Sequence, residues 1–485
     1  MKKKIVAIII LMLMITTAAP IVTAQNNDII RTTEKNNIAK SCASGGWIEK
    51  EKLIEPAPSV WSDSLCVSVS GDTSLIGDAR NHDSGLMDSG AAFFFTRTMT
   101  GTIQQEVIAP DVVVNLNFGF SVAIDGNTAF IGAIYENHEA GSVYVYTRTG
   151  NTWSYKDELY SPTPNDHDFF GWSVALDGDT AVIGAVWDDD SGTDSGAAFI
   201  YTYNTGTGKW GFTQQLLPSG LQGNDQFGFA VALDGNTALV SAWQDNDNGD
   251  FSGSAYVFIF SAGTWIQQGN KLLAPDGAAY DDFGRSVSIS GNMALVGAFG
   301  DDDQGDGSGS AYAFIRNGNT WSFQHKFLAP GGVADDLFGV SVSIDGNTAL
   351  IGAHHNGAAG SAYVFVYSPP TGVWTFWQKL VASNPTGGAY FGYSVSLDGD
   401  TALIGAPGVV TGYVFTIDYP LSTKFIFGVY ANKINGWTYM TIQAGAFLVS
   451  PGGGLYTSGM TLKFSKTTFI GYLGSIVIIG FAQVV

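Results

Sequence analysis

Residues 118–133 read FGFSVAIDGNTAFIGA, and the chain returns to close variants of this stretch five more times. The later copies begin at Phe170, Phe227, Phe283, Phe338 and Phe391, so that successive copies start 52 to 57 residues apart. A seventh, decayed copy, SDSLCVSVSGDTSLIGDA, occupies residues 62–79. A period near fifty built from short apolar runs is typical of a propeller or another repeat array. The sequence therefore predicts seven structural repeats.

Each copy predicts two β-strands joined by a tight turn. Val122, Ile124, Phe130 and Ile131 belong to short runs of β-branched and aromatic residues, which favour strands. Between the runs stands an Asp-Gly pair that includes Gly126, and this dipeptide between apolar runs is a strong hairpin signal. We therefore expect an all-β fold across the repeats.

These motifs resemble FG-GAP repeats: FG at the start, IGA at the end of the second strand and a G-S-A-Y-V-F strand beyond it. The family includes the N-terminal propeller of integrin α subunits and many secreted microbial proteins, and the resemblance covers residues 46–418. It implies a seven-bladed β-propeller and a role in adhesion or ligand recognition. Integrin repeats that bind calcium carry a D-x-D-x-D-G-like loop between the first two strands. Here that connection is only Asp-Gly-Asn or Asp-Gly-Asp, so the resemblance carries no calcium site over to these turns.

The order of the predicted strands indicates how the array closes. The first repeat is followed by a fourth strand around Ile103, and the next five by fourth strands that share a tryptophan: Trp153, Trp210, Trp265, Trp321 and Trp374. The seventh repeat ends at residues 414–416 without such a strand, yet GGWIEKEKLIEPAP, with Trp47, stands alone before the first repeat. We therefore predict that the Trp47 strand completes the last blade. Residues 46–418 then form one closed propeller without an open sheet edge.

The two ends of the chain are expected to differ from the propeller. Residues 1–24 combine three lysines, an apolar stretch and a small-residue cleavage site, which is typical of a secretory signal; an uncleaved anchor is the alternative. Residues 25–45 are polar and predict a flexible lead-in. Whether Cys42 in this lead-in pairs with Cys66 stays open. Residues 421–485 contain strand-like runs and predict a small β-rich module, whose uncharged end fits a buried strand better than a membrane anchor.

Composition narrows the choice of partner and location. The chain has 43 acidic and 22 basic residues and a formal net charge of −21. Such a chain lacks the basic surface that nucleic acids require, so nucleic acid is excluded as a partner. With an export signal at its start, the protein is expected at the cell surface or outside the cell, and we predict no transmembrane helix in the mature chain.

Carboxylates gather on the face opposite the Asp-Gly turns. In blades 3, 4 and 5 the loop after the second strand reads D-x-D-x-G and is followed by a further aspartate. Alternating carboxylates before a glycine turn can supply oxygen ligands for Ca²⁺, although the loops lack the distant bidentate glutamate of an EF-hand. Calcium sites and a solvated acidic surface are both open interpretations. The candidate calcium ligands are Asp188, Asp190, Asp194, Asp245, Asp247, Asp250, Asp301, Asp303 and Asp306.

The function that these observations favour is a non-enzymatic binding or adhesion module, which presents the acidic loop face to an extracellular protein or glycan. One alternative is a structural surface-layer component docked by the C-terminal module. A hydrolase or lyase with its site at the channel mouth is the least favoured. On the innermost strands Ser121, Val122, Ser173 and Val174 recur as small or apolar residues, and no nucleophile with its base stands out. Apart from calcium, no cofactor is expected, and the oligomeric state is left open.

Overall fold

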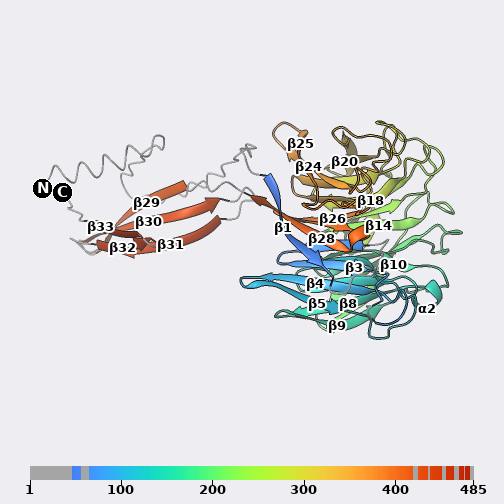
Figure 1. Cartoon of the computed structure of the whole chain (residues 1–485), viewed down its shortest axis with the longest axis horizontal. Coiled ribbons are helices and arrows are strands. Elements are labelled where there is room, and N and C mark those ends of the chain that lie inside the picture. Colours follow the sequence, from blue (N-terminus) through green and yellow to red (C-terminus); the bar gives the residue numbers. More distant parts are fainter. Residues whose placement is uncertain are drawn as a thin grey trace. The chain divides into compact units, whose positions relative to one another are not determined.

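The structure is a computed structural model that describes residues 46–55, 65–82 and 84–418, together with five strands between residues 424 and 480. The predicted signal sequence, the lead-in and Cys42 lie outside the described residues. Residues 46–418 form seven four-stranded antiparallel sheets, the blades of a propeller (Figure 1). The predicted fold class, an all-β seven-bladed propeller, is confirmed.

Blades 1 to 3 each take four consecutive strands. Blade 1 consists of β2 (Leu65–Ser70), β3 (Thr73–Asp78), β4 (Ala91–Thr98) and β5 (Gly101–Val107). Blade 2 consists of β6 (Phe118–Asp125), β7 (Thr128–Ala133), β8 (Ser142–Thr149) and β9 (Thr152–Leu159). Blade 3 consists of β10 (Phe170–Asp177), β11 (Thr180–Ala185), β12 (Ala197–Asn204) and β13 (Lys209–Leu216).

Blades 4 to 6 repeat this order. Blade 4 consists of β14 (Phe227–Asp234), β15 (Thr237–Ala242), β16 (Ser254–Ser261) and β17 (Thr264–Gln267). Blade 5 consists of β18 (Phe283–Ser290), β19 (Met293–Ala298), β20 (Ser310–Asn317) and β21 (Thr320–Phe327). Blade 6 consists of β22 (Val342–Asp345), β23 (Thr348–Ala353), β24 (Ser361–Ser368) and β25 (Val373–Leu380).

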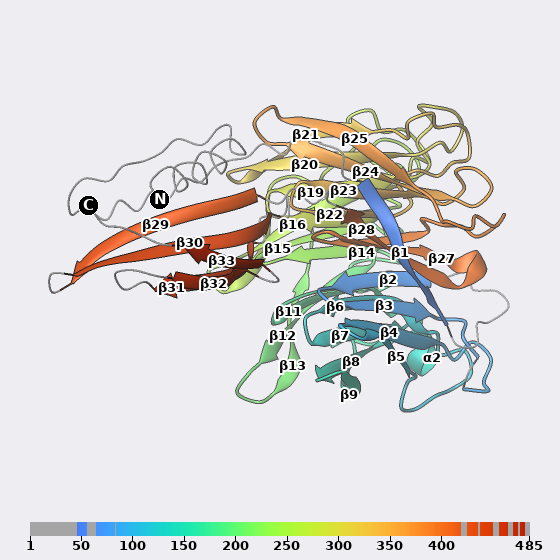
Figure 2. The same ribbon diagram turned by 60° about the vertical axis from the view of Figure 1, so that its left-hand side comes forward.

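Blade 7 is assembled from both ends of the repeat region. Its strands are β26 (Ser394–Asp398), β27 (Thr401–Ala406), β28 (Thr411–Asp418) and β1 (Gly46–Ile54). The first strand of the chain pairs antiparallel with β28, from Gly46 opposite Asp418 to Ile54 opposite Thr411, and Figure 2 shows the blue β1 beside the orange β28. The predicted closure by the Trp47 strand is therefore confirmed.

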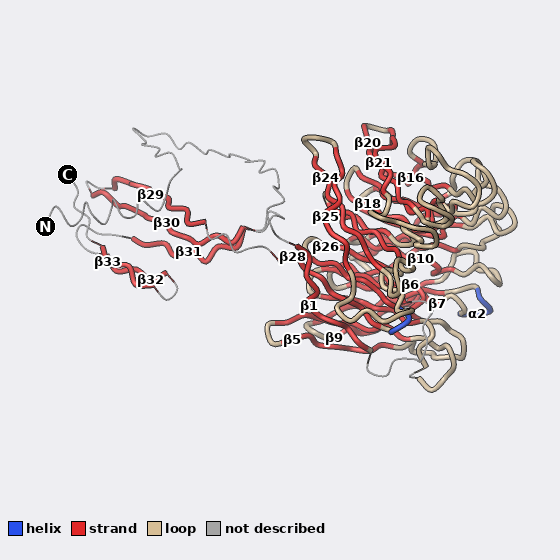
Figure 3. The backbone as a smooth tube through the Cα atoms, turned by 45° about the horizontal axis from the view of Figure 1, so that its top comes forward, coloured by secondary structure: helices blue, strands red, loops and turns tan. Residues whose placement is uncertain are grey.

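Strands and loops make up nearly all of the described chain (Figure 3). The helical segments are α2 (Glu136–Glu139) and the 3₁₀ turn η1 (Pro407–Val409). Beyond the propeller, one sheet contains β29 (Lys424–Ile434), β30 (Trp437–Val449) and β31 (Leu455–Lys463), and another contains β32 (Phe469–Leu473) and β33 (Ile476–Gly480). Within the described residues no helix is long and apolar enough to cross a membrane.

The repeated aromatic residues form the packing layers between blades. The phenylalanine of every FG pair from blade 2 onward is fully buried: Phe118, Phe170, Phe227, Phe283, Phe338 and Phe391. The fourth-strand tryptophans reach back to the preceding blade. Trp153 of β9 stacks on Phe94 of β4, with ring centroids 4.2 Å apart and planes 6° from parallel. Each aromatic ring thus buries apolar surface between two sheets, and this burial is the main force that holds neighbouring blades together.

The Asp-Gly turns also connect the blades. The Asp125 carboxylate accepts a hydrogen bond from the Gly178 N–H of the next blade at 2.8 Å. A serine oxygen replaces the carboxylate in blades 1 and 5, as in the 3.1 Å bond from the Gly126 N–H to Ser70. The same bond closes the ring, because the Gly71 N–H donates to Asp398 at 2.5 Å. All seven junctions carry this bond: Ser70–Gly126, Asp125–Gly178, Asp177–Gly235, Asp234–Gly291, Ser290–Gly346, Asp345–Gly399 and Asp398–Gly71.

A second junction bond explains the FGxS and IGA motifs. The Ser121 hydroxyl donates to the carbonyl of Gly171 in the next blade at 2.7 Å, and Ser173, Ser286 and Ser341 do the same. In blade 1 the thiol of the half-buried Cys66 occupies this position, 3.1 Å from the Gly119 carbonyl, and desolvation raises its pKa to about 12. The recurring serines of the innermost strands therefore link neighbouring blades.

Glycine is needed in IGA because the next blade approaches the backbone there. A Cβ at Gly132 would clash with the Gly171 carbonyl and the Ser121 hydroxyl, whereas a Cβ at Gly126 in the hairpin turn would meet nothing. We expect Gly132→Ala to lower the free energy of unfolding by about 3 kcal/mol or more, because rigid backbone must move. Gly126→Ala is expected to cost only about 1 kcal/mol for its positive φ of 54°. Chemical denaturation of the two variants checks this order, and equal losses would contradict it.

Candidate functional site on the loop face

The loops that follow the second strand of each blade, and the connectors that follow the fourth strand, lie at one end of the strands; we call this end the loop face. All nine predicted calcium ligands lie here, in the β11–β12, β15–β16 and β19–β20 loops. The first aspartate of each loop is buried: Asp188, Asp245 and Asp301. Its Oδ1 accepts the N–H of the residue two positions later, at 3.0 to 3.1 Å. The D-x-D pattern is thus part of the loop architecture.

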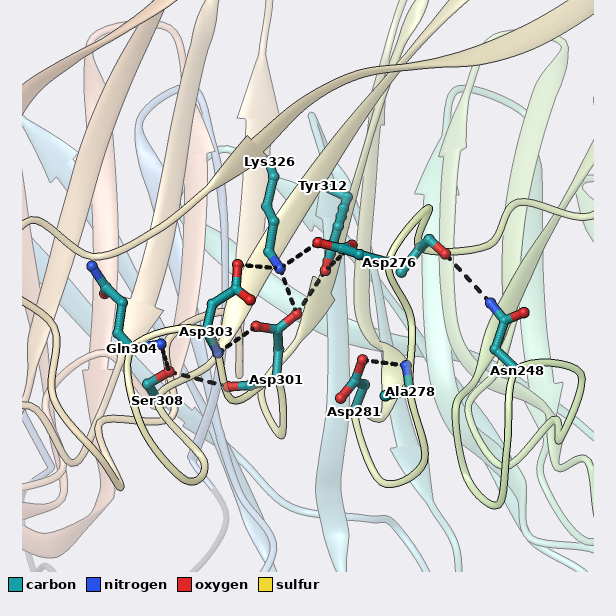
Figure 4. A network of polar contacts seen from close by, with 11 residues as sticks. Asn248, Asp276, Ala278, Asp281, Asp301, Asp303, Gln304, Ser308, Tyr312 and Lys326 are labelled. Atoms are coloured by element: carbon teal, nitrogen blue, oxygen red, sulfur yellow. Dashed lines mark hydrogen bonds and ion pairs between the residues drawn. The ribbon is translucent and has the colours of Figure 1, made fainter.

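Two lysines reach these carboxylates, one from the end of the fourth strand β21 and the other from the segment that follows the fourth strand β17. Figure 4 shows Lys326 in blade 5, whose Nζ lies 2.8 Å from Asp276, 2.8 Å from Asp301 and 2.6 Å from Asp303. In blade 4, Lys271 lies 2.5 Å from Asp245 and 2.8 Å from Asp247. Burial alone would lower the pKa of either lysine, but the carboxylates that bind it raise the pKa overall. Both lysines are therefore held as ammonium cations.

These ion pairs bear on the predicted calcium loops. In blades 4 and 5 a lysine ammonium group already binds the first two aspartates of the motif. Asp250 and Asp306 are exposed, and the third aspartate of blade 3, Asp194, is half-buried. In the described residues, the three carboxylates whose oxygens lie within 4.8 Å of one another belong instead to Asp111, Glu136 and Glu158 of blade 2. Calcium at the nine aspartates stays a prediction.

Aromatic side chains beside the propeller axis pack together at the loop-face end of the innermost strands. The residue after FG varies between blades and packs here: Phe120 contacts Trp172, Trp172 contacts Phe229, and Phe229 contacts Trp243, with ring centroids 4.7 to 5.7 Å apart. In blade 5 the same position is Arg285, whose guanidinium lies over the Phe229 ring at 4.9 Å. Such cation–π contacts stabilise a half-buried cation. This variable position was missed from the sequence, although it breaks the repeat where FGR replaces FGF or FGW.

Two titratable groups beside this axial cluster have shifted pKa values. Burial raises the pKa of the Asp282 carboxyl to about 7, against the opposing effect of Arg285. Burial, with His355 and Arg285 nearby, lowers the pKa of His354 to about 3. His354 and His355 also line a pocket of about 430 Å³ at blade 6, with Asp335, Asp336 and Tyr390 among its walls. At neutral pH His354 is therefore uncharged.

The loop face also presents aromatic side chains to solvent. Six of them, which we call the aromatic rim, are more than a third exposed: Tyr135, Tyr160, Trp187, Phe251, Tyr280 and Tyr390. Phe251 and Tyr280 lie side by side across the boundary of blades 4 and 5, with ring centroids 5.7 Å apart. Trp187 rests against Phe169 at 4.8 Å. Exposed rings held by a rigid scaffold among carboxylates can bind ligands through their faces while the carboxylates accept hydrogen bonds.

Fold and loops together define a β-propeller built on FG-GAP-type repeats. A family model described as FG-GAP repeat matches residues 102–146, 153–201, 210–258, 265–314, 321–365 and 374–415, more than half of the chain. The chain therefore belongs to the FG-GAP repeat family. Comparison with curated proteins gives no sequence match. One similar solved structure is the periplasmic gluconolactonase of Pseudomonas aeruginosa, with 16% identity and a TM-score of 0.43 over 67% of this chain and 87% of that one.

Proposed function

We propose that the protein is an exported, non-enzymatic binding module whose loop face recognises an extracellular glycan or protein. The observation that carries this proposal is the aromatic rim, because its rings stand exposed among acidic loops on one face of the propeller. Loops on a rigid scaffold commonly carry binding function, and exposed aromatic side chains are frequent anchors in recognition surfaces. A glycan suits this chemistry best, since sugar C–H faces stack on aromatic rings and carboxylates accept sugar hydroxyls.

The test compares two sets of alanine substitutions in the secreted protein on a glycan array. The rim variant replaces Trp187, Phe251, Tyr280 and Tyr390. The control variant replaces Phe212, Phe323 and Phe376, which are similarly exposed but lie on fourth strands away from the loop face. The rim variant is expected to lose at least about tenfold in affinity, or about 1.4 kcal/mol, while the control binds like the wild type. Equal binding by all three proteins would refute the proposal, and binding only to protein partners would redirect it to a protein ligand.

A hydrolase at the axial mouth is the competing function, because Asp282 has a pKa near that of a useful acid or base and lies beside Arg285. Hydrolytic activity that Asp282→Asn abolishes would favour the enzyme over the binding module. Assays of hydrolysis with the same glycans that the array presents distinguish the two functions.

A further inference from the structure

One position at the end of the fourth strand differs between blades in a way that suggests a cation site. The residue that precedes the buried leucine or phenylalanine is lysine in four blades: Lys52, Lys271, Lys326 and Lys379. In blade 1 it is Glu106, which precedes the buried Val107, in blade 2 it is Glu158 and in blade 3 it is Gln215. Register shows that these positions are equivalent, since Glu158 pairs with Tyr144 and Gln215 with Phe199, as Lys326 pairs with Tyr312.

In the lysine blades the ammonium group always occupies the same place. It lies over the ring of the third-strand tyrosine, at 5.2 to 5.9 Å from the centroid, in all four blades. In blades 4 and 5 it also binds Oδ2 of the first two aspartates of the loop. In blade 6 it binds the Asn356 side chain instead. We call this place the cation position of the repeat.

Blade 2 keeps the carboxylates of this position but reverses the charge of the fourth-strand residue. Tyr144 donates to Asp111 at 2.8 Å, as Tyr312 of blade 5 donates to Asp276 at 3.0 Å. With Glu158 in place of the lysine, three carboxylates have oxygens within 4.8 Å of one another. Oε1 of Glu158 is buried and has no hydrogen-bond partner. Three carboxylates at this separation repel one another, and a cation between them would relieve that repulsion.

Blade 3 provides independent evidence for the same position. Asp188 is fully buried, and its Oδ2 has no hydrogen-bond partner. In blades 4 and 5 the equivalent atom is the one that binds the lysine ammonium. Gln215, which replaces the lysine, carries no positive charge, so no ammonium group from the fourth strand balances Asp188 in blade 3. A buried carboxyl oxygen without a partner is costly, and a cation at this position would remove that cost.

We propose that blades 2 and 3 each bind a divalent cation at the position that lysine ammonium occupies in blades 4 to 7. The ligands are Asp111, Glu136 and Glu158 in blade 2, and Asp188 and Asp190 in blade 3. All are carboxylate oxygens, which suit the hard cation Ca²⁺, and water completes its six to eight ligands. This inference is independent of the proposed ligand of the loop face.

Calorimetric titration of the secreted protein with calcium chloride, after removal of metal by a chelator, tests the proposal. The wild type is expected to bind two calcium ions, with affinity in the millimolar range or better typical of extracellular modules. Glu158→Lys and Gln215→Lys supply the ammonium from the chain, so each variant should bind one ion and the double variant none. A wild type that binds no calcium overturns the proposal. So does a double variant that binds as many ions as the wild type, because calcium would then lie elsewhere, as at the Asp245 or Asp301 loops.

Two further variants keep the test decisive if the lysine substitutions do not fold. Glu158→Gln removes one carboxylate at nearly constant shape and is expected to weaken the blade 2 site by at least about tenfold. Lys326→Glu converts blade 5 to the pattern of blade 2 and is expected to add one calcium ion. Unchanged stoichiometry in Lys326→Glu, together with unchanged affinity in Glu158→Gln, would show that the fourth-strand residue does not control cation binding.

Discussion

Deletion of β1, residues 46–54, is expected to abolish the cooperative unfolding of the propeller. The deletion removes Trp47 and Leu53, both about 2% exposed, and leaves β28 as an open sheet edge. Loss of two such side chains from a core costs about 5–10 kcal/mol in total, which is comparable with the whole stability of a domain. An exposed edge also templates pairing with other chains. Scanning calorimetry and light scattering should show a broad, weakened transition with aggregation.

The control is a protein truncated to begin at residue 43, which retains β1. It is expected to melt with a single sharp transition. The double substitution Trp47→Ala and Leu53→Ala separates lost packing from lost backbone pairing, because it keeps the strand but removes its buried side chains. A β1 deletion that melts like the truncation control would show that the ring does not need the N-terminal strand.

Much of this architecture could be predicted from the sequence because repetition makes weak signals add up. The Asp-Gly turns, the FG pairs and the position of Trp47 predicted seven blades and their closure, and the strand pairing confirms both. The junction bonds could not be predicted. The Asp125 carboxylate binds Gly178 of the next blade only because of how the two sheets pack. Neither residue has a sequence context that predicts this bond.

The acidic loops illustrate a different limit. The sequence correctly predicted that Asp245 and Asp301 lie on one face, but it did not connect them with Lys271 and Lys326, which follow 26 and 25 residues later. Only the return of the fourth strand brings each lysine to its loop. An alignment of the repeats against one another contains a usable signal. The residue before the buried end of the fourth strand is lysine in some blades and glutamate or glutamine in others. A count of the charged residues within the loops alone does not include this fourth-strand position.

The Lys326 network should be the most sensitive polar cluster in the propeller. Lys326→Met removes the ammonium that three carboxylates share, and Asp301 among them is about 4% exposed. Breaking a buried pair by removing one partner leaves an uncompensated charge, which costs about 3–5 kcal/mol. We therefore expect Lys326→Met to lower the free energy of unfolding by about 3 kcal/mol at neutral pH, measured by chemical denaturation.

Blade 6 offers a matched control. Lys379 occupies the same position and lies over Tyr363 at 5.3 Å, but it binds the neutral side chain of Asn356. Lys379→Met therefore leaves no directly bound carboxylate without its partner. Its expected cost is that of one hydrogen bond, about 1 kcal/mol. A methionine preserves most of the apolar part of the lysine side chain in both variants. The difference between their losses of unfolding free energy therefore measures the cost of the unpaired negative charge in blade 5. Equal losses in the two blades would mean that the aspartates of blade 5 remain solvated without the lysine, and the electrostatic account of the cation position would then fail.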